Sequence, residues 1–115
     1  MDVEWLRKYC LSFPATSEEI KWGNDLCFLV VDKMFCVSSL EAPYKIAFKV
    51  SDEEYETLSV SEGFQPAPYM ARAKWVLISS SNTLSKKQWE QYIRQSYELV
   101  KDKLTKKVRK ENGIE

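Results

Sequence analysis

The stretch LCFLVVDKMFCVSSLE, residues 26–41, is the part of the sequence that decides the fold. Its first half, LCFLVVD, is an almost continuous apolar run, which is typical of a central β-strand. Asp32-Lys33 indicates a tight turn, and MFCVSSLE then predicts a second strand. Two strands joined by so short a turn run antiparallel. The stretch therefore predicts a β-hairpin at the centre of an antiparallel sheet.

Further strands lie on both sides of this hairpin. The segment YKIAFKV, residues 44–50, places Lys45 and Lys49 on one face and Tyr44, Ile46, Phe48 and Val50 on the other. Such alternation is typical of a half-buried antiparallel strand. Ala42-Pro43 separates this strand from the hairpin, and WVLISS, residues 75–80, predicts a late strand. Residues 16–22 are short and partly β-like, and the turn signal WGND, residues 22–25, follows them.

Two shorter helices are predicted from their end signals. Asp2 is placed to cap a first helix, which ends before Pro14. Ser51 and Glu54 form a capping box, so a second helix begins there and continues to about residue 60, with Gly63 beyond its end.

A long third helix is predicted near the C-terminus. Ser85 and Gln88 form its capping box. Its apolar stripe, at spacings of three and four, comprises Trp89, Ile93, Ser96, Tyr97, Val100, Leu104 and Val108. Hairpin-linked strands with helices in separate positions predict the α+β class. We expect a two-layer sandwich in which an antiparallel sheet of about five strands is covered by the N- and C-terminal helices.

The composition excludes several functional classes. With 115 residues, of which 44% are hydrophobic, the chain is expected to form one domain, residues 1–115, with its own core. It contains no histidine, which removes imidazole bases and imidazole metal ligands, so we expect no enzyme activity, no cofactor and no metal. No apolar run has the length of a membrane span, and the acidic, amphipathic start is unlike a signal peptide. We therefore expect a cytoplasmic protein without membrane contact.

The three cysteines, Cys10, Cys27 and Cys36, lie in hydrophobic surroundings. An odd count in such surroundings indicates reduced, buried thiols. Cys27 and Cys36 fall on adjacent predicted strands, which leaves a disulfide or a metal pair between them as the alternative.

The net charge is zero, but the charges are unevenly distributed along the chain. Residues 1–66 carry 12 acidic and 6 basic side chains, whereas residues 67–115 carry 5 acidic and 11 basic ones. This asymmetry points to a basic face. The alternative is a folded domain in which the two halves neutralise each other.

Five segments together resemble a known family. They are KWGND, CFLVVDKMFCVSSL, IAFKVSDEEYETL, PAPYMARAKWVLI and QSYELVKDKL, and their order is that of the YjbR/MmcQ family. The resemblance covers about residues 2–110. It implies a compact antiparallel fold that has been likened to secretion chaperones and to frataxin, and a DNA-binding role of the double-wing type. One departure is the segment from Met70 to Lys74, which has fewer cations than many members have.

The segment FQPAPYMARAKWVLISS, residues 64–80, contains the first candidate site, formed by Tyr69, Arg72, Lys74 and Trp75. Cations can contact phosphates, and exposed aromatics can stack on bases. The alternative is an extended lead-in to a strand, in which Trp75 packs against the core and the two cations are solvated.

The second candidate site is a lysine stripe on the predicted long helix. Lys103, Lys106, Lys107 and Lys110 fall within about 100° of arc at 100° per residue. Such a stripe suits phosphate or an acidic partner. The alternative is that the lysines only complement the negative end of the helix dipole.

Two further candidates are weaker. Trp22 and Asn24, in the predicted turn, are expected to line a cleft together with Tyr69 and Trp75; a tight turn covering the core edge is the alternative. The acidic set Asp52, Glu53, Glu54 and Glu56 invites an iron-binding role by analogy with frataxin, although carboxylates also favour a first helical turn.

These observations leave three functional hypotheses. The leading one is a non-catalytic cytoplasmic binding domain that contacts DNA weakly and in a salt-sensitive way, because the net charge is zero. The second is a protein-interaction or chaperone-like module, which would expose an apolar groove or form a dimer; otherwise we expect a monomer. The third is an enzyme, which a convergent pocket of titratable side chains would indicate.

Overall fold

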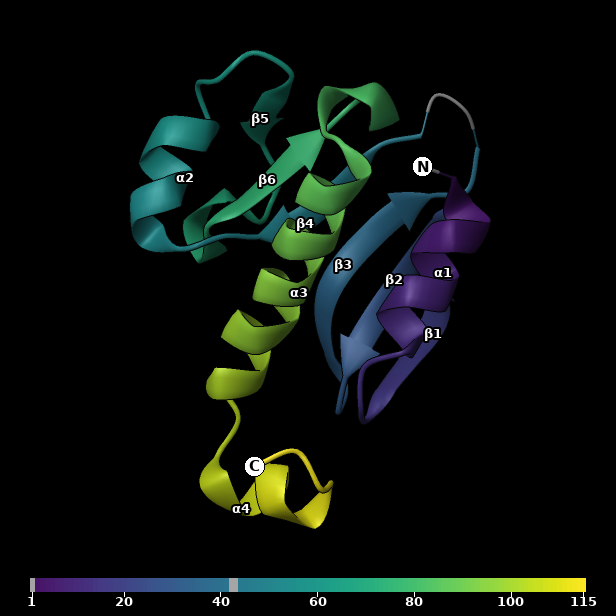
Figure 1. Ribbon diagram of the computed structural model, residues 1–115, viewed down its shortest axis with the longest axis vertical. Helices are drawn as coiled ribbons and strands as arrows, with labels where there is room; N and C mark the ends of the chain where they lie inside the picture. Colours follow the sequence, from purple (N-terminus) through teal and green to yellow (C-terminus); the bar gives the residue numbers. More distant parts are fainter. Residues whose placement is uncertain (1, 42–43) are drawn as a thin grey trace.

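The computed structural model describes residues 2–41 and 44–115, and within them six strands form one antiparallel sheet in the order β1-β2-β3-β4-β6-β5 (Figure 1). The strands are β1 (Thr16–Lys21), β2 (Asp25–Val30), β3 (Lys33–Ser39), β4 (Ile46–Lys49), β5 (Phe64–Pro66) and β6 (Trp75–Ile78). The helices are α1 (Val3–Leu11), α2 (Asp52–Leu58), α3 (Lys86–Asp102) and α4 (Lys106–Glu111), with 3₁₀ turns η1 (Ala71–Ala73) and η2 (Ser81–Thr83).

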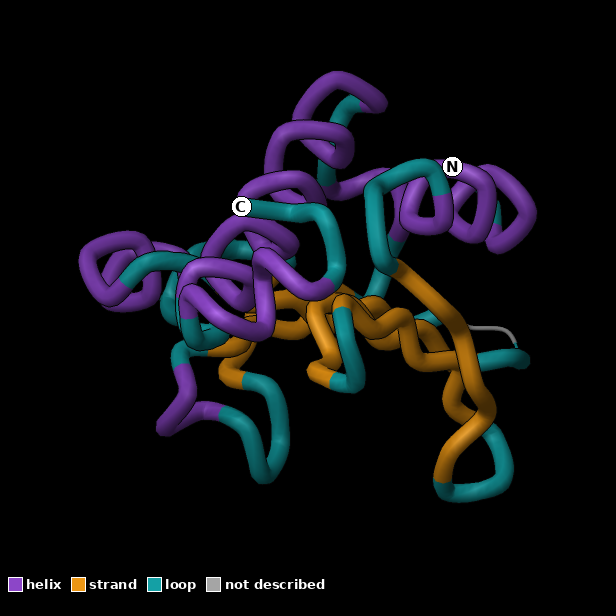
Figure 2. Tube along the Cα trace, turned by 90° about the horizontal axis from the view of Figure 1, so that it is seen from below, coloured by secondary structure: helices purple, strands orange, loops and turns teal. Residues whose placement is uncertain are grey.

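The α+β class and the layered arrangement are confirmed. Figure 2 shows the main helices on one side of the sheet. The core between helices and sheet contains Phe28, Phe48 and Trp89, all fully buried. The sheet has one strand more than the five or so expected, because the proline-rich segment after Gly63 forms β5. β5 is an edge strand, and Pro66 is tolerated there because an edge needs no donor on its outer side.

The central hairpin forms as predicted, with its turn one residue earlier. Val30 pairs with Lys33, and the two turn residues Val31 and Asp32 have φ values of 49° and 76°. Positive φ at both positions matches the twist of a two-residue hairpin turn.

A β-bulge interrupts the same hairpin. Phe28 pairs with Cys36 and Leu29 with Met34, so Phe35 has no partner on β2. The buried Ser96 hydroxyl, from α3, donates a hydrogen bond to the Phe35 carbonyl oxygen at 2.5 Å. It also accepts a hydrogen bond from the Lys49 backbone N–H at 2.9 Å. One helix side chain therefore satisfies buried backbone groups of both β3 and β4.

The expectation that β4 is half-buried is wrong. All four of its residues are buried, and Lys49 is only 7% exposed. Ile46 and Phe48 face the main core, while Ala47 joins a second apolar cluster on the opposite face, which residues 67–75 partly cover. Alternation identified the two faces of β4, but a segment distant in sequence covers the face that holds Lys49.

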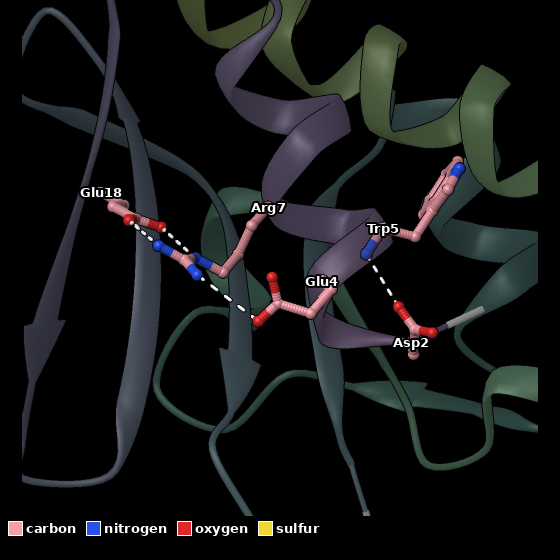
Figure 3. Close-up of polar contacts among 5 residues, drawn as sticks. All are labelled: Asp2, Glu4, Trp5, Arg7 and Glu18. Atoms are coloured by element: carbon pink, nitrogen blue, oxygen red, sulfur yellow. Dashed lines mark hydrogen bonds and ion pairs between the residues drawn. The ribbon is translucent and has the colours of Figure 1, made fainter.

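Helix α1 is held by a capping residue at its N-terminus and by an arginine that contacts strand β1 (Figure 3). Asp2 caps it, with its carboxylate accepting a hydrogen bond from the Trp5 N–H at 2.8 Å. Arg7 makes a two-pronged contact with Glu18 of β1, at 2.9 Å from Nε and 2.7 Å from Nη2. This hydrogen bonding lowers the pKa of the Glu18 carboxyl. Bidentate Arg–carboxylate geometry holds the helix to the edge strand.

The expectation of one long C-terminal helix is also wrong. Helix α3 ends at Asp102, and Thr105 caps the separate helix α4 by accepting a hydrogen bond from the Val108 N–H. The two predicted capping boxes, Ser51 with Glu54 and Ser85 with Gln88, are confirmed. Threonine after a helical stretch is itself a start signal for a new helix, and at Thr105 that signal overrides the apolar period.

The alternative of a Cys27–Cys36 pair is ruled out by the register. Cys27 pairs with Val37, and Cys36 pairs with Phe28, so the two side chains point to opposite faces of the sheet. All three thiols are free and buried. Burial raises the pKa of Cys10 well above its usual value, with a further contribution from a hydrogen bond with Cys36.

Within the described residues, no helix combines the length and the apolar character that crossing a bilayer requires. The predicted break at Ala42-Pro43 lies outside the described residues.

Candidate functional site

The sheet face opposite the main helices carries a small apolar cluster. Its buried members are Cys27, Leu29, Val37, Ala47, Ala67 and Trp75, and Met34, Met70 and Leu77 pack against it half-buried. The covering segment, residues 67–75, crosses only part of this face. The rest of the face remains open to solvent beside the segment.

A groove of about 690 Å³ lies along the edge of this covering segment. We call it the open-face groove; it is lined by Trp22, Asp25, Met34, Val37, Ser39, Lys45, Ala47, Ala67, Pro68, Tyr69, Met70 and Leu77. Its volume is that of an ordinary ligand pocket, and its walls are mainly apolar with a few polar groups. Those polar groups include one carboxylate, Asp25, and one ammonium, Lys45.

Two aromatic side chains stand at the rim of the open-face groove with little packing. Trp22 is 67% exposed and Tyr69 is fully exposed. Both have positive φ, 54° and 65°, a conformation that costs a bulky residue about 1–2 kcal/mol. Neither cost is offset by burial. The positive φ of Trp22 belongs to the turn between β1 and β2, so it is the exposure of the two rings that favours a role in contacting a ligand.

A second hollow, of about 360 Å³, continues from the groove toward the end of α3. We call it the lysine hollow; it is lined by Lys33, Met34, Lys49, Met70, Ala73, Trp75, Val100, Lys103 and Leu104. Met34 and Met70 line both cavities, so the two are adjacent. The lining of the lysine hollow contains three lysines and no carboxylate.

Lys49 is the buried member of the lysine hollow. Its ammonium group donates a hydrogen bond to the Ala73 carbonyl oxygen. Burial lowers the pKa of Lys49, and the nearby Lys103 lowers it further, while Asp52 acts in the opposite direction. Among the residues described, no carboxylate forms an ion pair with any of the three lysines. The hollow therefore concentrates positive charge over an apolar floor.

The structure separates the residues of the first predicted site. Tyr69 is at the groove rim, and Arg72 is exposed in η1. Trp75 is 5% exposed, and it forms part of the floor of the lysine hollow. Lys74, half-buried with φ 65°, has its ammonium 5.1 Å from the centre of the Tyr55 ring on α2. Lys74 thus contacts an aromatic neighbour outside the groove lining.

The residues of the predicted cleft are divided between the two cavities. Trp22 and Tyr69 line the open-face groove together, Trp75 lines the lysine hollow, and Asn24 lines neither. The Asn24 carbonyl oxygen instead accepts a hydrogen bond from the Leu40 N–H at 2.9 Å. This bond connects the turn between β1 and β2 to the residue that follows β3.

The predicted lysine stripe does not exist as one helical face. Lys103 follows the end of α3 and lines the lysine hollow. Lys106, Lys107 and Lys110 lie on α4 and are exposed. The chain turns between the two helices, so spacing on a single helix axis no longer relates Lys103 to the other three.

The acidic set lies where helix electrostatics favours carboxylates. Asp52, Glu53 and Glu54 occupy the first turn of α2. Glu54 closes the capping box and accepts a hydrogen bond from Gln95 at 2.7 Å. The described residues contain no cluster of three or more side chains arranged to hold a metal ion.

Sequence reasoning missed the residues that build most of the two cavities. Lys33, Met34 and Met70 were not singled out, and Lys49 was placed on a solvent face. A signal for Lys49 is present in the sequence, because it ends the otherwise apolar strand IAFK and faces the same side as Ala47.

Comparison with known proteins places the chain in a family. The YjbR family model matches residues 11–99. The chain belongs to the YjbR family. No curated protein matches the chain.

Solved structures share its fold. The Deinococcus radiodurans protein DR2400, with a DUF419 domain, is 25% identical with a TM-score of 0.86, covering 98% of this chain and 88% of its own. A Pseudomonas syringae protein, structural genomics target PsR293, is 20% identical with a TM-score of 0.70, covering 86% of this chain and 98% of its own. The second likeness shows the fold alone. Family membership supports an α+β domain, and the two cavities are features of this YjbR chain's own geometry.

Proposed function

We propose that this YjbR domain is a non-catalytic binding domain whose open-face groove takes single-stranded nucleic acid. The observation that carries the proposal is the pair of exposed, strained aromatics, Trp22 and Tyr69, beside a hollow lined by three lysines. Bases stack on exposed aromatic rings, and ammonium groups attract the phosphates between them.

The arrangement favours a single strand over a duplex. Helix α3 buries Trp89, Ile93 and Val100 against the sheet, so it does not project as a helix for the major groove. Helix α4 has only six residues. An apolar groove with exposed aromatic side chains instead suits unstacked bases, which are available only in a single strand.

The test is a fluorescence anisotropy titration with a labelled oligothymidylate of about ten nucleotides, within the usual site size of such platforms. Micromolar affinity in low salt is expected. The logarithm of the association constant should fall with the logarithm of salt concentration with a slope of about −2, as expected for three phosphate contacts. Duplex DNA of the same length should bind more weakly.

Two variants assign the binding to the groove. Trp22→Asn and Tyr69→Asn each remove a stacking surface, and asparagine tolerates positive φ better than either aromatic. Stability should therefore hold while affinity falls about fivefold to a hundredfold, which is the worth of one stacked base. Tyr44→Asn is the matched control, because Tyr44 is 41% exposed and does not line the groove. Absence of binding at micromolar protein in low salt, or unchanged affinity in both variants, would refute the proposal.

A second candidate function is a protein-interaction module that holds an extended apolar peptide. The specific observation in its favour is the groove floor, where Met34, Met70 and Leu77 are half-buried and face the opening. Methionine side chains adapt to varied partners. If this candidate is right, an apolar peptide should still bind in high salt, where any binding of oligothymidylate is lost. Leu77→Ser should lower the affinity for the peptide and leave any affinity for oligothymidylate unchanged.

A further inference from the structure

The lysine hollow combines a cluster of ammonium groups with an apolar floor, which the stacking of bases alone does not require. Lys33 and Lys103 are exposed at its mouth, and Lys49 is 7% exposed at its base. The Lys49 ammonium has one protein acceptor, the Ala73 carbonyl oxygen, and so retains further N–H donors. Its floor is apolar and includes Trp75 and Leu104.

We propose that the lysine hollow is a binding site for a small phosphate monoester that carries an apolar group. The monoester is a dianion with three terminal oxygens, which matches three ammonium groups better than a carboxylate does. The apolar group would lie on Trp75 and Leu104. The hollow's volume of about 360 Å³ is at the lower end of ligand pockets and suits a molecule of that size.

Two features of the surroundings act against an anion, and the lysines outweigh them. Helix α3 ends at the hollow and contributes the negative end of its dipole, roughly half an elementary charge. Asp52 is close enough to act on Lys49, although it does not line the hollow. Three lysines, with Lys74 also acting on Lys49, leave the site positive, and a bound dianion would relieve the repulsion between Lys49 and Lys103.

The test uses phenyl phosphate as the probe, with the whole chain at pH 8, followed by two-dimensional ¹H–¹⁵N NMR. Saturable binding is expected, with a shift of the Trp75 indole N–H and none for Trp22. Benzoate, a monoanion of similar shape, should bind at least tenfold more weakly. Inorganic phosphate should bind more weakly than phenyl phosphate, because it lacks the group that contacts the floor.

Charge-removing variants localise the site. Lys33→Gln and Lys103→Gln change exposed side chains, so both should fold, and each should weaken phenyl phosphate about tenfold. Lys106→Gln on α4 is the matched control and should leave binding unchanged. The proposal is overturned if phenyl phosphate does not saturate, if benzoate binds equally well, or if Lys33→Gln and Lys103→Gln bind as the parent does.

This site shares its three lysines with the proposed nucleic-acid function, but it does not use the aromatic rim of the open-face groove. The variant Trp22→Asn should lose oligothymidylate affinity and keep phenyl phosphate affinity, because Trp22 lines the groove and not the hollow. An oligothymidylate without terminal phosphates tests the first function alone. Failure of one proposal is therefore distinguishable from failure of the other.

Discussion

Replacing Ser96 by alanine tests how α3 holds the centre of the sheet. The Ser96 hydroxyl is fully buried, donates to the Phe35 carbonyl oxygen and accepts from the Lys49 N–H. Phe35 is the bulged residue of β3, and Lys49 lies one residue beyond the last pair between β3 and β4, Cys36 with Phe48. Ser96→Ala removes both hydrogen bonds at once and offers no polar atom in their place.

The expected magnitude follows from the two orphaned groups. A buried donor or acceptor left unsatisfied costs about 1–3 kcal/mol, so the pair costs about 2–6 kcal/mol. Alanine is a better helix former than serine, and this returns about 0.5 kcal/mol. We therefore expect Ser96→Ala to lower the free energy of unfolding by about 1.5–5.5 kcal/mol, a large part of the stability of a domain this size.

The assay is urea unfolding followed by far-UV circular dichroism, with the slope of the transition compared between proteins. Gln91→Ala, at an exposed position of the same helix, is the control and should change the free energy of unfolding by less than about 0.5 kcal/mol. A loss for Ser96→Ala no larger than that of the control would refute the argument, because the hydroxyl would then not be satisfying the two strands.

Two further predictions concern backbone strain and acid stability. Gly63→Ala should destabilise more than Gly113→Ala in thermal unfolding, because both glycines have positive φ but only at Gly63 would a Cβ lie 2.7 Å from the Thr83 side chain; equal shifts would contradict the steric reason. Arg7→Gln should lower stability more at pH 6 than at pH 3. The Arg7 hydrogen bond lowers the pKa of Glu18 in the folded state, so its contribution is present above the ordinary carboxyl pKa and is lost as the pH falls through the folded-state value. A difference between the urea midpoints of parent and variant that is as large at pH 3 as at pH 6 would contradict this account.

The local features of the fold were predictable because their causes lie within a few residues. Asp2, Ser51 and Ser85 cap helices through hydrogen bonds to their own first turns. The alternation in β4 separated the face of Ile46 and Phe48 from the face of Lys49 correctly. Such signals need no knowledge of what packs above them.

The candidate site was predictable only in part. The sequence singled out Tyr69, Trp22 and Trp75 as aromatics near turns and strand starts, and the structure places them along two adjacent cavities. It placed Lys103 in a helical stripe, whereas Lys103 instead lines a hollow with Lys33 and Lys49. Those three lysines are far apart in sequence, and only the packing of α3 across the sheet brings them together.

The sequence was sufficient to predict the hairpin, the starts of α1, α2 and α3, the α+β class and the family of this chain. The end of α3 at Asp102 was not predicted, although its cause, the Thr105 cap of α4, is local. Only the tertiary structure shows that Cys27 and Cys36 face opposite ways and that Lys49 is covered. The physical reason is that each of these depends on contacts between distant segments. A bulge shifts the register of β3 against β2, and the segment after Ala67 crosses a sheet face that alternation alone leaves open to water.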